Sequence, residues 1–238
     1  MDYRLDPRLA AARARAEVID EGLRAYMLSV YNYMALALAI TGLTAWVTAQ
    51  SPAMMQLVFG TPLVWVVMLA PLGFVFFLGA RIHAMSVGAA QITFWLFAVV
   101  MGLSMASIFL VFTGASIARV FFVTAATFGA MSLYGYTTKR DLSAWGSFLF
   151  MGLIGIVIAA LVNIFLASSA LHFAISVIGV IVFTGLTAYD TQAIKEEYYA
   201  HDAPEVATRK AIMGALRLYL DFVNLFMMLL QLLGQRRD

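Results

Sequence analysis

The sequence contains no cysteine, which excludes disulfide bonds, thiol chemistry and cysteine-based metal sites. It is also poor in charge, because 12% of its 238 residues are charged where a typical soluble domain has roughly a quarter. It has no Walker-type or dinucleotide-type glycine loop, and we expect neither a cofactor nor a nucleic-acid partner. Its first 25 residues are charged and lack the apolar stretch of a cleavable signal peptide.

Hydrophobic residues, by contrast, make up 63% of the chain. They come in blocks of about 20, the length that crosses a bilayer core as a helix. These runs lack the alternation of barrel strands, which leaves helices as the spanning structure. The sequence therefore predicts an all-α integral membrane protein, a bundle of seven transmembrane helices near residues 27–49, 62–81, 89–113, 116–136, 144–167, 170–193 and 211–233.

The connections between the blocks are short, so we expect one transmembrane domain over residues 26–235. Residues 1–25 form a charged N-terminal tail that we predict to be cytoplasmic. Two interpretations of residues 8–25 stay open, an amphipathic helix on the membrane surface and a solvated tail.

Lysine and arginine alternate between connections, which predicts orientation by the positive-inside rule. The tail and the connections after the second, fourth and sixth blocks are basic, which places the N-terminus in the cytoplasm. Arg236 and Arg237 at the C-terminus disagree with seven spans, since that count puts them outside. Either the C-terminal end is an exception to the positive-inside rule or the last block re-enters the membrane.

Ionisable residues inside membrane spans are costly and are candidates for function. The candidates are Arg81, Asp190, Arg217 and Asp221, with Arg119 weaker because it can extend to the interface. Asp221 is the strongest, because it lies about ten residues into its block, ~15 Å along a helix. Its carboxyl group must be protonated or find a partner inside the bundle.

The predicted topology puts Asp190, Asp221 and Arg81 in the same layer of the bilayer, from three different helices. Two carboxyl groups in contact would release their protons in two coupled steps, and a nearby guanidinium would compete with the proton. This arrangement would act as a proton-operated latch. The alternative is a structural ion pair that fixes helix register. Arg217 lies one turn before Asp221 on the same face and is either an interfacial anchor or a modulator of the pair.

The remaining polar residues have simpler interpretations. Glu196, Glu197, Asp202 and Glu205 are expected to form a solvated loop face. The three histidines have no metal-ligand spacing. Asn163 and Asn224 are expected to make hydrogen bonds between helices.

Three segments resemble the Bax inhibitor-1 family, also called transmembrane Bax inhibitor motif proteins, in its bacterial branch. "FTGLTAYDTQAIK" at 183–195 and "LYLDFVNLF" at 218–226 look like the two signature segments of this family. "FFLGARI" at 76–82 looks like its second-helix segment. The resemblance covers about residues 20–235 and implies a seven-helix bundle with the last helix at its centre, in a bacterial inner (plasma) membrane.

The resemblance also implies a function. Bacterial members of the family are described as pH-sensitive calcium leak channels, with an aspartate pair as the pH sensor and an arginine that helps to latch the closed state. The matching residues here are Asp190, Asp221 and Arg81. Calcium, the expected transported ion, prefers oxygen ligands such as carboxylates, so the two aspartates would bind it transiently. Arg217 departs from the family pattern, where we expect a small or acidic residue.

Two other functions compete with a leak channel. Some bacterial relatives associate with a membrane-anchored AAA protease and modulate it, and the charged N-terminal tail would be the contact. An intramembrane aspartyl protease would also carry two aspartates on adjacent helices. Asp221 lies in "YLDF", however, and lacks the "GxGD"-type context of those enzymes, so we expect no enzymatic activity.

Overall fold

The computed structural model describes the backbone of residues 7–237 and the side chains of residues 20–237. Within this part of the chain, seven helical spans are long and apolar enough to cross a membrane, which confirms the predicted all-α membrane bundle. The helices are α1 (Pro7–Gln50), α2 (Pro52–Phe59), α3 (Leu63–Arg81), a 3-10 turn η1 (Ile82–Ala84), α4 (Val87–Met105), α5 (Ile108–Val111), α6 (Gly114–Thr137), α7 (Ser143–Leu166), α8 (Ser169–Glu196) and α9 (Pro204–Leu233).

Short polar residues set where several helices begin. Ser51, Ser86, Thr113 and Ser168 each stand before a helix in extended conformation, and each side chain accepts a hydrogen bond from a backbone N–H of the first turn. Such caps satisfy donors that the helix itself leaves free. α2 was not expected from the sequence, and it fills the connection between the first and second spans.

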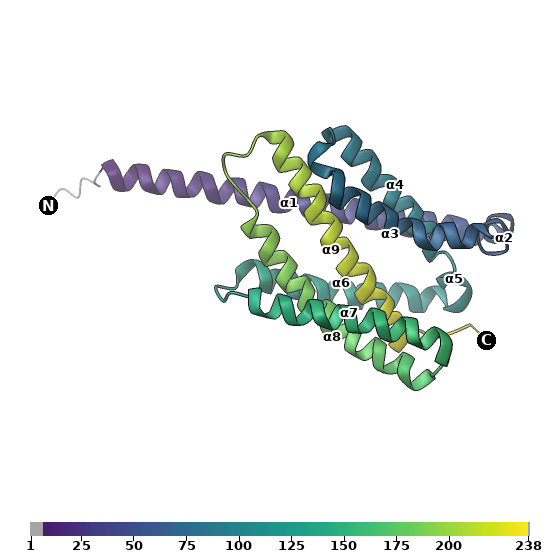
Figure 1. Ribbon diagram of the computed structural model, residues 1–238. Coiled ribbons are helices and arrows are strands. Elements are labelled where there is room, and N and C mark those ends of the chain that lie inside the picture. The colour runs from purple at the N-terminus through teal and green to yellow at the C-terminus, as the bar shows by residue number, and fades with distance from the viewer. Residues whose placement is uncertain (1–6, 238) are drawn as a thin grey trace.

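The last helix lies at the centre of the bundle, as predicted. Figure 1 shows α9 crossing between a group formed by α1, α3 and α4 and a group formed by α6, α7 and α8. Its most apolar stretch is 56% buried, against 11% to 39% for the other spans. Tyr219 on α9 is fully buried, and its hydroxyl group lies 2.7 Å from Thr41 Oγ1 of α1. Thr41 donates to the Ala98 carbonyl oxygen of α4, so one polar chain joins three helices.

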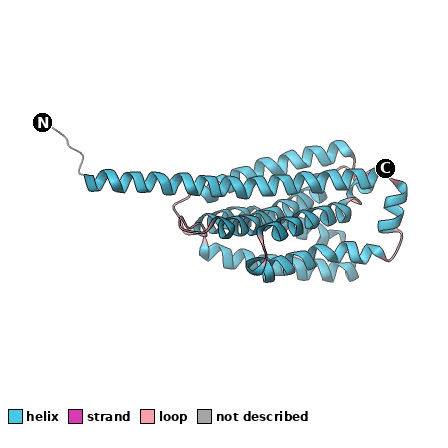
Figure 2. Ribbon diagram, turned by 90° about the horizontal axis from the view of Figure 1, so that it is seen from above, coloured by secondary structure: helices cyan, strands magenta, loops and turns pink. Residues whose placement is uncertain are grey.

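The first helix extends well past the bundle at one end (Figure 2). Its 44 residues correspond to about 66 Å at 1.5 Å per residue, longer than a bilayer is thick. Residues 7–25, assigned to the tail by sequence, are the continuous start of α1, and residues 1–6 lie outside the described residues.

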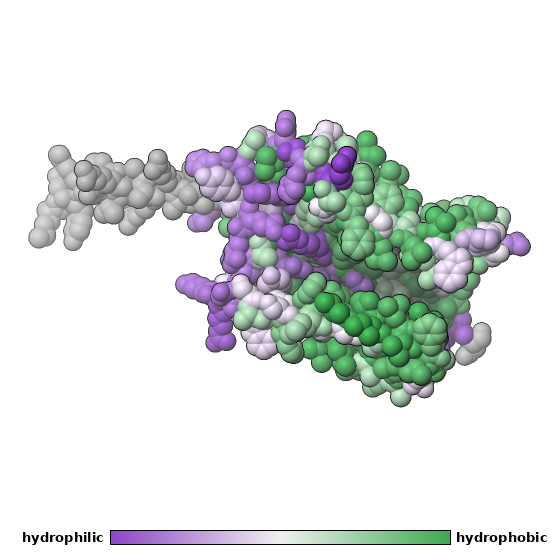
Figure 3. Space-filling model, in the orientation of Figure 1, coloured by the Kyte–Doolittle hydropathy of each residue, from purple (hydrophilic) through white to green (hydrophobic). Residues whose placement is uncertain are grey.

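Hydrophilic residues gather at the end of the bundle from which α1 protrudes (Figure 3). Side chains of α8 and α9 make hydrogen bonds there with backbone groups in or near the connections between other helices. Arg209 donates to the carbonyl oxygen of Met85, between α3 and α4, and Lys195 donates to that of Tyr136 near the end of α6. Gln192 donates to Arg140 and accepts from Leu142 in the α6–α7 connection. The basic connections therefore share one end, as their alternation in the sequence predicted.

The C-terminus lies at the other end (Figure 1). Gln235 accepts a hydrogen bond from the Thr113 amide, and Arg237 donates to the Val111 carbonyl oxygen. α9 is unbroken from Pro204 to Leu233 and joins both ends, so the re-entrant alternative for the last block is wrong.

α6 and α8 pack closely because small residues line their contact. An added Cβ on Gly135 would lie 2.2 Å from the carbonyl oxygen of Ala188. On the same face of α6, Ser132 Oγ lies 2.9 Å from Thr191 Oγ1 of α8. Small residues of this kind let helix backbones approach in a membrane.

Candidate functional site

A cavity of about 500 Å³ lies between α7, α8 and α9. α8 packs against both of the other helices, and its residues line the cavity with those of α7 and α9. Most of the lining is apolar. The polar residues are Ser147 and Tyr189 together with four that argue for function, Asp190, Arg217, Asp221 and Asn224.

The structure brings the two predicted aspartates together. Asp190 of α8 and Asp221 of α9 both line this cavity. Asp221 is 5% exposed, whereas Asp190 is half-buried. Asp221 Oδ2 is fully buried and accepts no hydrogen bond from any residue in 20–237. A buried carboxyl oxygen without a partner is costly to maintain, so this pair is not a saturated structural contact.

Arg217 lines the same cavity, one turn before Asp221 on α9. Its Nη1 lies 2.6 Å from Glu197 Oε1, and the two side chains are 40% and 35% exposed. Its positive charge also attracts Asp190. Because an ion pair this exposed adds little stability, its placement at the cavity matters more than its strength.

Two of the four acidic residues expected to form a solvated loop face, Glu197 and Asp202, are paired with cations, whereas Glu196 and Glu205 are exposed as expected. Glu197 pairs with Arg217, and Asp202 Oδ2 lies 2.7 Å from Lys210 Nζ. Lys210 also donates to the Glu197 carbonyl oxygen. Two cations of α9 thus hold the α8–α9 connection beside the cavity.

Arg81 stands apart from this site. It ends α3 at the same end of the bundle, but it is exposed and is not among the residues that line the cavity. Among residues 20–237 it makes neither an ion pair nor a side-chain hydrogen bond. Its role as a latch stays a prediction.

Asn224 differs from expectation in a smaller way. It lines the cavity, and its Nδ2 donates to the Leu220 carbonyl oxygen one turn earlier in α9, 2.8 Å away. The predicted hydrogen bond to another helix is therefore not its contact.

Comparison with known proteins gives this site its context. The family model described as "Inhibitor of apoptosis-promoting Bax1" matches residues 23–238. The chain belongs to the Bax inhibitor-1 family. It is 51% identical over 225 residues to the uncharacterized protein RP147 of Rickettsia prowazekii, covering 94% of this chain and 95% of that protein. It is 50% identical over 219 residues to the inner membrane protein YbhL of Escherichia coli, covering 91% and 94%.

Family membership confirms the resemblance that was based on the two aspartate segments. Sequence reasoning found both aspartates and Arg217 but missed Glu197 as the partner of Arg217. One signal was available, because Glu196 and Glu197 stand at the C-terminal end of α8, where the helix dipole disfavours negative charge. Acidic residues in that position indicate that a nearby cation compensates them.

Proposed function

We propose that this Bax inhibitor-1 family protein is a pH-sensitive cation leak channel, chiefly for calcium, with Asp190 and Asp221 as pH sensor and part of the ion pathway. The observation that supports this proposal is that Asp190 and Asp221 line the wall of one cavity in an apolar bundle. Carboxylate oxygens are the ligands that calcium prefers. No group of three or more potential metal ligands occurs among the described residues, and a site with two carboxylates suits passage better than storage.

Proton control follows from the coupling of the two carboxyl groups. Two acids in contact lose their protons in two separate steps that belong to the pair. The doubly ionised pair attracts calcium and the Arg217 guanidinium alike, whereas the fully protonated pair attracts neither. The pH would thus set whether protons, Arg217 or calcium neutralise the site.

The orientation of the chain belongs to the same proposal. We infer a bacterial inner membrane, because the relative YbhL is named an inner membrane protein. The basic end of the bundle, with the N-terminus, would face the cytoplasm by the positive-inside rule. The carboxyl cavity would then lie toward the cytoplasmic side.

Flux measurements in proteoliposomes test the proposal. The purified full chain is reconstituted with a calcium-sensitive dye inside, and calcium entry is followed over a pH series beside protein-free vesicles. We expect pH-dependent entry in the wild type, and a rate independent of pH in the double variant Asp190→Asn/Asp221→Asn. Absence of flux at every pH would refute the channel.

The Arg217–Glu197 pair predicts two opposite effects on that flux. Arg217→Gln removes a fixed positive charge from the cavity, so calcium entry should rise by about tenfold at low salt. Glu197→Gln removes the partner of Arg217 and leaves the guanidinium to the aspartates, so entry should fall. Both effects should shrink in high salt, because exposed charges are screened.

Arg81→Gln is the matched control for Arg217→Gln, since Arg81 is an exposed arginine at the same end of the bundle but outside the cavity. If the cavity residue Arg217 is the latch, Arg81→Gln should leave the flux within about twofold of the wild type, a change of less than 0.5 kcal/mol. If Arg81→Gln alters the pH dependence and Arg217→Gln does not, the latch is Arg81, as the family resemblance implies.

The protruding start of α1 favours a second candidate function, modulation of a membrane-anchored AAA protease. A helix that leaves the bundle (Figure 2) offers a contact for a partner at the same membrane surface. Deleting residues 1–19 should abolish co-purification with such a protease and leave calcium flux unchanged. Loss of flux with unchanged co-purification would contradict this role.

A further inference from the structure

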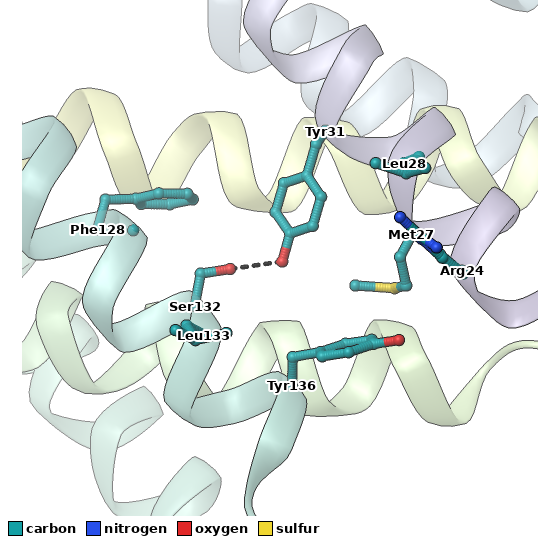
Figure 4. A pocket seen from close by; sticks show the side chains of 9 residues that line it. Arg24, Met27, Leu28, Tyr31, Phe128, Ser132, Leu133 and Tyr136 are labelled. Carbon is teal, nitrogen blue, oxygen red and sulfur yellow. Dashed lines mark hydrogen bonds between the residues drawn. The ribbon is translucent and has the colours of Figure 1, made fainter. Parts of the chain in front are cut away.

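A groove of about 540 Å³ separates α1 from α6 at the basic end of the bundle. α1 packs against α4 and α9, whereas α6 packs against α8 and α9, so the two helices diverge from each other. Figure 4 shows Met27 and Leu28 of α1 facing Phe128 and Leu133 of α6 across the opening. Leu28 and Leu133 are exposed, so the groove is open at the side of the bundle, where the bilayer surrounds the spans.

The hydroxyl groups of Tyr31 and Ser132 inside the groove are already satisfied. The Tyr31 hydroxyl lies 2.6 Å from Ser132 Oγ, and Ser132 Oγ lies 2.9 Å from Thr191 Oγ1. Thr191 Oγ1 must be the donor to the Thr187 carbonyl oxygen, 2.7 Å away. Ser132 therefore donates to Thr191, and Tyr31 donates to Ser132. The hydroxyl hydrogens of all three residues are thus used. The Tyr31 and Ser132 hydroxyls therefore offer no free donor, and this part of the groove fits a hydrocarbon segment.

The charge at the groove is positive. Arg24 is exposed and is the one charged residue that lines the groove among the residues described. The ion pairs within residues 20–237 are Lys210–Asp202 and Arg217–Glu197, so no carboxylate of these residues holds the Arg24 guanidinium. Tyr136 lines the groove as well, and Lys195 Nζ lies 5.7 Å from the centre of its ring. A second cation thus stands behind the groove wall.

We propose that this groove binds one anionic phospholipid, with an acyl chain between α1 and α6 and the headgroup phosphate at Arg24. A guanidinium matches the oxygens of a phosphate with paired hydrogen bonds. The apolar walls accept a chain, because the hydroxyl groups of Tyr31 and Ser132 between them are satisfied. The groove shares no lining residue with the carboxyl cavity, so the lipid site can be tested separately from the proposed channel.

Native mass spectrometry of the full chain in detergent tests the site. The protein is titrated with phosphatidylglycerol and with phosphatidylcholine of the same acyl chains. We expect one bound lipid and a preference for phosphatidylglycerol of about fivefold, the effect of one basic side chain near an anionic lipid. Arg24→Gln should remove the preference. Arg119→Gln changes an exposed arginine on α6 that does not line the groove. This variant should keep the preference.

A second pair of variants tests the acyl part. Gly129 lines the groove, and an added Cβ there meets no atom within 4 Å, so Gly129→Leu fills the groove and leaves the fold intact. It should weaken the binding of both lipids by roughly threefold or more, because the chain loses its packing contacts. Gly155 on α7 also has open space around it, but Gly155→Leu should change nothing.

Two outcomes overturn the proposal. Equal binding of both lipids, unchanged by Arg24→Gln, would mean that the groove holds only the exchangeable lipid that surrounds any membrane protein. A dimer that Gly129→Leu dissociates would mean that a second copy of the chain occupies the groove.

Discussion

Replacing Asp221 by asparagine is expected to flatten the pH dependence of calcium flux. Asparagine has nearly the same shape but does not titrate, so the coupled release of two protons can no longer occur. A wild-type rate that follows a carboxyl titration changes by up to about tenfold per pH unit. The profile of Asp221→Asn should be less steep, because only Asp190 of the pair can still titrate, and that of the double variant should vary by less than about twofold. The measurement is dye-reported calcium entry into proteoliposomes over a pH series.

Asp141→Asn is the control for Asp221→Asn, because it removes an aspartate outside the cavity. Asp141 stands before α7, and its Oδ1 accepts a hydrogen bond from the Ser143 amide at 2.8 Å. Hydrogen bonds from the side chain and amide of Ser143 lower the pKa of the Asp141 carboxyl. This contact therefore stabilises the fold above the unfolded-state pKa and is lost only as the pH falls through the lower folded-state pKa. Asp141 stays ionised over about pH 5–8, so its loss should leave the pH profile unchanged.

The pH profile of Asp221→Asn decides whether the carboxyl pair senses pH. A profile as steep as that of the wild type would show that the carboxyl pair does not sense pH. If Asp190→Asn flattens the profile as well, both members of the pair are needed, as a coupled site requires. An effect of Asp190→Asn alone would assign the titration to the half-buried residue and not to the pair.

Replacing Gly135 by alanine should destabilise the protein strongly for one added methyl group. Its Cβ would lie 2.2 Å from the Ala188 carbonyl oxygen and 2.9 Å from the Ala188 carbonyl carbon. Backbone atoms cannot rotate out of the way, so α6 and α8 must separate, and the Ser132–Thr191 contact weakens with them. Overpacking costs about 3 kcal/mol, which lowers the melting temperature by about 6–12 °C in a chain of this size.

Gly129→Ala is the matched control on the same helix. Its new Cβ meets no atom within 4 Å, and alanine is the better helix former by about 1 kcal/mol. Its melting temperature in detergent should stay the same or rise slightly. Thermal unfolding followed by circular dichroism compares the two variants, and equal melting temperatures would show that α6 and α8 are not held at this distance.

Gly135 and Gly129 also show where sequence reasoning stops. Both lie in α6 among small and apolar residues, and nothing in the sequence distinguishes them. Gly152, Gly179 and Gly185 also allow close packing, since an added Cβ at each would come within about 3 Å of a neighbouring side chain. Gly155, in the same helix as Gly152, lies in open space.

The sequence by itself determined the seven spans and their order, because the length of an apolar run decides whether a helix crosses a bilayer. It also determined that Asp221 is exceptional, because a short acidic side chain deep in such a run cannot reach water, and that Asp190 is an ionisable residue near the end of another run. Their positions along the chain fix their depth in the membrane. Depth and sidedness sufficed to predict that the two aspartates lie in one layer.

Only the tertiary structure decided which charges meet in that layer. Depth leaves open the direction in which a side chain points, and lipid surrounds apolar helices on every side, so hydrophobic periodicity does not reveal their inner face. Arg81 and Arg217 both lie toward the basic end, yet Arg217 lines the carboxyl cavity and Arg81 is exposed outside it. Glu197 became the partner of Arg217 because the α8–α9 connection lies beside the cavity, a contact across 20 residues that no local pattern encodes.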